Sequence, residues 1–93
     1  MEIKNNVLIK VKKSDIPEDG KFIIPNDVKI IGKGAFQGFK KLRSVVIPSN
    51  VRVIEEGAFS YCKSLKSIVI PNTVKRMGFC AFWRCSSLNF LII

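Results

Sequence analysis

Residues 54–74 read IEEGAFSYCKSLKSIVIPNTV, and the same pattern recurs both before and after this stretch with a 23-residue period. Self-similarity at a fixed period of about 20 to 50 residues is typical of a solenoid, in which each repeat stacks on the next. The 93 residues therefore predict a single solenoid domain of about three repeats. Five columns carry the period: Pro25, Pro48, Pro71; Val28, Val51, Val74; Ala35, Ala58, Ala81; Phe36, Phe59, Phe82; and Leu42, Leu65, Leu88.

Each repeat is expected to contain two short extended segments and one turn. The first segment ends before the proline, which has no N–H to give to a ladder. The predicted first segments are residues 44–47, 67–70 and 90–93, and the predicted second segments are residues 28–31, 51–54 and 74–77. A short helical turn is expected at each Ala-Phe pair, so the fold class is an α/β-type repeat solenoid with parallel strands.

Alternation along the first segment predicts which side chains face the core. Leu42, Val45 and Ile47 are expected inside, whereas Ser44 and Val46 are expected outside. A strict 23-residue period then gives two outward columns: Ser44, Ser67, Phe90 and Val46, Val69, Ile92.

The N-terminal segment, residues 1–20, departs from the repeat. Asn5-Asn6 favours a hairpin turn, because Asn tolerates positive φ, and strands are expected at 2–4 and 7–12. Terminal repeats of solenoids are usually atypical, since one face would otherwise be wet. We predict an N-terminal β-hairpin cap over residues 1–20 and the repeat solenoid over residues 21–93.

The unit in residues 54–74 resembles the BspA-like (Treponema-type) leucine-rich repeat, and the resemblance covers residues 21–93. It implies a curved right-handed coil with a strand-lined face. It also implies binding of proteins or surfaces rather than catalysis.

Composition argues against an enzyme and against a metal site. The chain has no His, which removes the commonest general base and zinc ligand. No phosphate-binding loop or nucleophile elbow is present, and we expect no cofactor. Cys62 and Cys85 share a column with Phe39, which predicts a ladder of small buried thiols rather than a disulfide.

The net charge is +9, and no acidic residue follows Glu56. Such a surface attracts acidic proteins and polyanions. One predicted basic ladder consists of Lys29, Arg52 and Lys75, with Arg76 beside it; phosphate backbones are its obvious ligand, and a solvated lysine column is the alternative.

A second predicted surface is the strand face, where exposed apolar side chains mark an interface. Its candidate residues are Arg43, Val46, Lys66, Val69, Phe90 and Ile92. The apolar edge at residues 89–93 leaves three outcomes open: homodimerisation through the uncapped last coil, coverage by a partner, or continuation of a longer array.

The sequence thus predicts a non-catalytic protein-binding module with an acidic protein partner. One alternative is a small basic inhibitor of a nucleoprotein complex, of the anti-CRISPR type, that contacts nucleic acid or a nucleic-acid-binding channel. Another is a fragment of a longer adhesin-type array. With no signal peptide or apolar span in the sequence, an intracellular location without membrane contact is expected.

Overall fold

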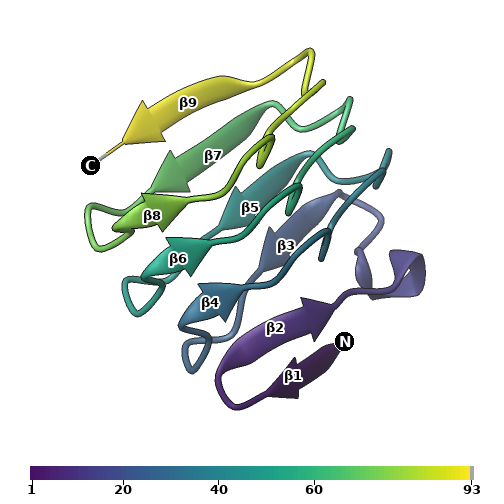
Figure 1. Cartoon of the computed structure of the whole chain (residues 1–93). Helices are drawn as coiled ribbons and strands as arrows, with labels where there is room; N and C mark the ends of the chain where they lie inside the picture. Colours follow the sequence, from purple (N-terminus) through teal and green to yellow (C-terminus); the bar gives the residue numbers. More distant parts are fainter. Residues whose placement is uncertain (93) are drawn as a thin grey trace.

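The computed structural model describes residues 1–92, and these form a solenoid built almost entirely of short strands and turns. Two sheets run along it, and both climb from the N-terminal hairpin toward the C-terminus (Figure 1). One sheet has the order β1-β2-β4-β6-β8 and the other β3-β5-β7-β9. The elements are β1 (Glu2–Lys4), β2 (Val7–Lys10), the 3-10 turn η1 (Lys13–Asp15), β3 (Lys21–Ile23), β4 (Ile30–Ile31), β5 (Ser44–Val46), β6 (Val53–Ile54), β7 (Ser67–Ile70), β8 (Arg76–Met77) and β9 (Asn89–Ile92).

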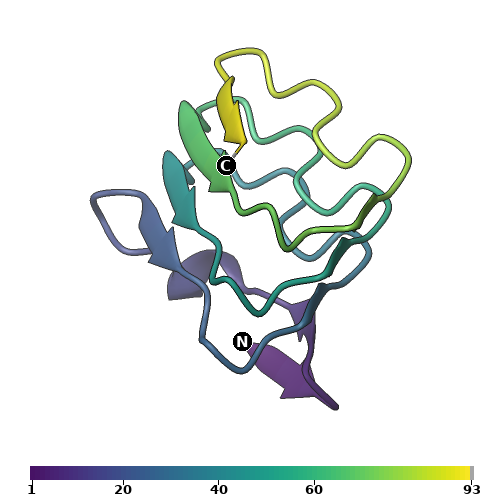
Figure 2. The same cartoon turned by 90° about the vertical axis from the view of Figure 1, so that its left-hand side faces the viewer.

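The repeat period sets the register of the stacked coils. Ser44 pairs with Ser67 and Val46 with Val69, both in parallel, and Ile30 pairs with Val53 in the other sheet. From β3 to β8 the coils therefore place equivalent residues directly over one another, as the repeat predicts. Figure 2 shows the successive coils following nearly the same path.

The core lies between the two sheets and the turns, as the alternation predicts. Leu42 is fully buried, Val45 and Ile47 are buried, and Val46 is exposed. A column of phenylalanine rings runs through this core. Phe36 and Phe59 stack with ring centroids 4.7 Å apart, and Phe59 and Phe82 stack at 5.1 Å.

The predicted helical turn at each Ala-Phe pair is wrong. The chain there makes isolated turns, such as the bond from the Ala35 N–H to the Gly32 carbonyl at 3.2 Å. Gly34 and Gly38 lie in the left-handed region, with φ of 60° and 75°, and this conformation interrupts a right-handed helix. Backbone groups of successive coils form hydrogen bonds with each other instead. For example, the Phe36 N–H bonds the Ala58 carbonyl at 2.8 Å.

The N-terminal hairpin turns at Asn5 and Asn6, both with positive φ, as the sequence predicts. Its strand β2 pairs in parallel with β4, Val7 with Ile30 and Leu8 with Ile31. The two members of each pair are one repeat period apart in the chain, so β2 occupies the place of a preceding repeat. This continuation of the register was not predicted.

The coil at residues 71–92 covers its core less completely than the coil before it. Val74, Phe82 and Leu88 are only half-buried, whereas their counterparts Val51, Phe59 and Leu65 are fully buried. The three outcomes predicted for this end of the solenoid stay open.

Candidate functional site

The outer face of the sheet β3-β5-β7-β9 carries a column of exposed branched side chains. Ile23 pairs with Val46, and Val46 pairs with Val69. Their exposed fractions are 72%, 56% and 41%. Val46 and Val69 lie where the sequence predicts. Ile23 was missed, although its position one repeat period before Val46 was a sufficient signal.

Cationic side chains flank this apolar column. Arg43 and Lys66 come directly before β5 and β7, and both are exposed. Their backbones stack, because the Lys66 N–H bonds the Arg43 carbonyl at 2.8 Å. Lys21 begins β3 and is exposed as well. Within residues 1–92 none of these three cations forms an ion pair with a carboxylate.

The side chains of two predicted face residues, Phe90 and Ile92, lie outside what the structure describes. The backbone register of β9 nevertheless differs from the prediction. Phe90 pairs with Ile68 and Leu91 with Val69, so the spacing along the chain is one residue shorter than the repeat period. Because β9 begins at Asn89, one residue earlier than the period implies, Leu91 takes the place that was assigned to Ile92. A shift of one residue exchanges the two faces of a strand.

The predicted basic ladder is stacked as expected. The Arg52 N–H bonds the Lys29 carbonyl at 2.8 Å, and the Lys75 N–H bonds the Arg52 carbonyl at 2.7 Å. All three side chains are exposed, and so is Arg76 in β8. The Arg52 guanidinium also donates to the Ser49 carbonyl at 2.9 Å, which ties it to its own turn. Binding of a polyanion by this ladder stays a prediction.

The thiols of Cys62 and Cys85, which share one column of the repeat, are packed into the fold. Cys62 is fully buried, and its thiol donates to the Phe36 carbonyl with a sulfur–oxygen distance of 3.1 Å. Burial raises the pKa of the Cys62 thiol from 9.0 to about 12. Cys85 is half-buried, bonds the Phe59 carbonyl at 3.0 Å, and also has a raised pKa through burial. Both are free thiols, as is Cys80.

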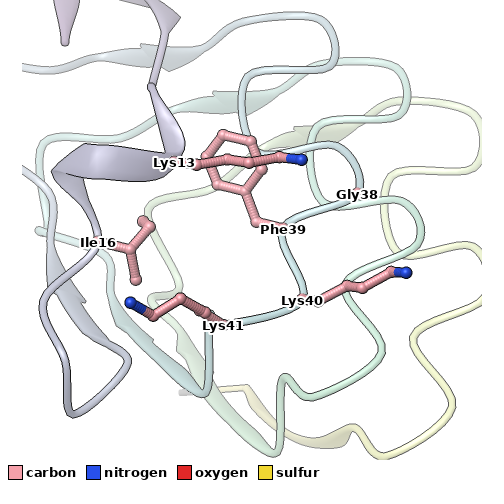
Figure 3. A pocket seen from close by; sticks show the side chains of 6 residues that line it. All are labelled: Lys13, Ile16, Gly38, Phe39, Lys40 and Lys41. Atoms are coloured by element: carbon pink, nitrogen blue, oxygen red, sulfur yellow. The ribbon is translucent and has the colours of Figure 1, made fainter.

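A small hollow lies where the N-terminal segment crosses the turn of the first coil. Lys13, Lys40 and Lys41 surround it, and Ile16 and Phe39 line its apolar part. In Figure 3 the side chains of Lys40 and Lys41 point away from each other. Lys41 forms an ion pair with Glu18 at 3.4 Å. The three lysine side chains therefore do not converge on a single anion-binding point.

The described residues hold no cluster of three or more His, Cys, Asp or Glu side chains that could bind a metal ion. No helix among residues 1–92 is long and apolar enough to span a membrane.

An open groove crosses the turns of three coils and was not predicted. It exposes Tyr61, Phe79 and Trp83, with exposed fractions of 37%, 80% and 49%. These aromatic residues occupy three different columns of the repeat, so a comparison of equivalent residues between repeats does not group them. Only the turn geometry brings them together.

The stacked parallel strands, the regular coils and the buried leucine and phenylalanine columns define a leucine-rich-repeat solenoid. The chain belongs to the family described as "BspA type Leucine rich repeat region (6 copies)", whose model matches residues 18–93.

A solved structure with a similar fold is a leucine rich cell surface protein from Faecalibacterium prausnitzii A2-165. The two share 24% sequence identity with a TM-score of 0.56, over 97% of this chain and 36% of that chain. This chain thus spans about a third of the length of that protein, and the likeness is one of fold. No curated protein matches the chain.

Proposed function

We propose that this leucine-rich-repeat chain is a non-catalytic module that binds an acidic protein through the outer face of β3-β5-β7-β9. The observation that carries the proposal is the stacked column of Ile23, Val46 and Val69, which leaves branched apolar side chains exposed on three neighbouring strands. Aligned exposed apolar side chains form a continuous patch of the kind that marks interfaces.

The charges around this column favour an acidic partner. Arg43 and Lys66 lie at its edge without carboxylate partners among residues 1–92, while Glu18 is already paired with Lys41. Complementary charge steers association and raises its rate more than it raises affinity. The apolar column would therefore supply most of the binding free energy, and the two cations the orientation.

The test is capture of a partner by the tagged chain from a lysate of source cells, with and without nuclease, at low and moderate salt. We expect to capture a protein whose binding survives both treatments. That binding should be lost in the double variant that combines Val46→Ser and Val69→Ser. Ile9→Ser is the matched control, because Ile9 is also an exposed aliphatic residue but lies on β2. Binding that disappears with nuclease would instead favour the predicted nucleoprotein alternative and its basic ladder.

A further inference from the structure

The open groove across the turns is separate from the proposed strand face. Its charged and polar side chains stand in columns of the repeat: Lys33 and Glu56 in one, and Gln37 and Ser60 in another. Phe79 and Trp83 continue these two columns in the last coil. A ligand lying along the solenoid would thus meet an aromatic pair in one coil and polar groups in the next two.

Glycine occupies the position between the two columns in the first two coils. A Cβ at Gly34 would lie 3.0 Å from Oε1 of Gln37, and a Cβ at Gly57 would lie 3.5 Å from Oγ of Ser60. Side chains at these positions would therefore extend toward residues that line the groove. In the last coil Cys80 takes this place.

The aromatic end is held by contacts between side chains. The Tyr61 ring meets the Trp83 ring edge-on, with centroids 5.4 Å apart. The Arg84 guanidinium carbon lies 5.1 Å from the centroid of the same Trp83 ring. Phe79 is 80% exposed in a column that carries charged residues in the other coils. Phe79 and Trp83 thus both present exposed rings on the lining of the groove, and such rings suit a flat apolar group.

The backbone conformation of the turns positions these side chains. Tyr61, Cys80 and Arg84 have φ values of 62°, 57° and 63°, in the left-handed region that favours glycine. Glycine does stand at the matching positions of the first coil, Gly34 and Gly38. The same left-handed turn therefore recurs in the other coils, and in these positions it sets the Tyr61 and Cys80 side chains on the lining of the groove.

The hydrogen-bonding groups of the groove are mostly donors. Lys33, Gln37, Tyr61 and Trp83 can all donate, and the groove has one carboxylate, Glu56. A proline-rich segment has the complementary chemistry, because its carbonyls accept and its prolines have no N–H to satisfy. A polyproline II helix advances about 9.3 Å per turn of three residues, close to two coil spacings of about 4.8 Å.

We propose that this groove binds a proline-rich peptide segment in the polyproline II conformation, with a proline ring packed between Phe79 and Trp83. Glu56 forms no ion pair among residues 1–92, and it receives a basic side chain of the peptide. Aromatic-lined grooves recognise polyproline II segments in this way because the ligand is already extended before it binds. This interaction does not require the strand face, so either proposal can fail alone.

Trp83 is the single tryptophan of the chain, so its fluorescence reports binding in the groove directly. The probes are a proline-rich decapeptide with one arginine, the same peptide with every proline replaced by alanine, and a neutral oligosaccharide. We expect a saturable emission change with the proline-rich peptide. The alanine peptide should bind with an affinity at least about tenfold lower.

Phe79→Ser should lower affinity for the proline-rich peptide by about tenfold or more, and its high exposure means that the fold is retained. Glu56→Gln should lower it by about threefold, as for an exposed ion pair. Lys10→Ala on β2 is the control and should change nothing. Equal binding of the alanine peptide, a response to the oligosaccharide alone, or no response to any probe overturns the proposal.

Discussion

The rings of Phe36 and Phe59, which lie one repeat period apart in the chain, stack with their planes 10° from parallel and their centroids 4.7 Å apart. Both side chains are fully buried. The repeat period is thus expressed as a physical contact between neighbouring coils, and the middle phenylalanine of the column stabilises two coil interfaces at once. A solenoid derives its stability from such interfaces between neighbours.

Replacing the middle ring should therefore cost the most. Phe59→Ala removes a fully buried ring with stacking partners on both sides, and we expect a loss of about 3–5 kcal/mol in the free energy of unfolding. Phe82→Ala should cost clearly less, because Phe82 is half-buried. Urea unfolding followed by circular dichroism measures both, and equal losses would show that the column does not act through burial.

Cys80→Gly should stabilise the fold. Cys80 holds φ at 57°, where a side chain is disfavoured, and glycine occupies the same column in the other coils. After allowance for the greater freedom of glycine in the unfolded chain, we expect a gain of about 0.5–1 kcal/mol. Cys80→Ala is the control that removes the thiol but keeps the strain. A gain in that variant of the same size would contradict the backbone explanation.

The buried Cys62 thiol should make stability depend on alkaline pH. Its pKa is raised to about 12 in the fold from the ordinary 9.0, so the folded state favours the protonated form. The stability that this group contributes is complete below pH 9.0 and is lost as pH rises toward about 12.

Unfolding free energies of the protein and of Cys62→Ala, measured between neutral pH and the onset of alkaline denaturation, isolate this effect. The variant is less stable at neutral pH because of its cavity, and the difference should narrow as pH rises. A difference that stays constant across the range would mean that the thiol does not titrate as its burial implies. Alkylation should also modify Cys80 before Cys62, since Cys80 is the more accessible of the two.

The repeat predicted most of the fold because its columns correspond to stacked contacts. Val45 and Ile47 are buried and Val46 is exposed, as strand alternation requires. The same reasoning failed where the residue pattern does not show the repeat or where the spacing changes. Leu8 lies in register with Ile31 although the residues around it do not resemble a repeat. Phe90 pairs with Ile68, whereas the repeat period would pair it with Ser67. No residue pattern in the sequence indicates this shift of one residue.

The candidate surfaces were predictable to different degrees. Val46 and Val69 were found because one strand face is read directly from alternation. The aromatic groove was not found, because Tyr61, Phe79 and Trp83 belong to separate columns and meet only through left-handed turn residues. The geometry of a turn depends on these single φ values, which hydrophobic periodicity does not report.

Binding of the captured partner to two charge-reversed double variants tests the proposed face most directly. Arg43→Glu with Lys66→Glu alters the strand face, and Lys29→Glu with Lys75→Glu alters the basic ladder by the same net charge. The proposed function predicts that the first pair lowers affinity by about tenfold or more, chiefly through a slower association rate, and that the second has a small effect. The opposite ranking would contradict the strand face as the binding surface.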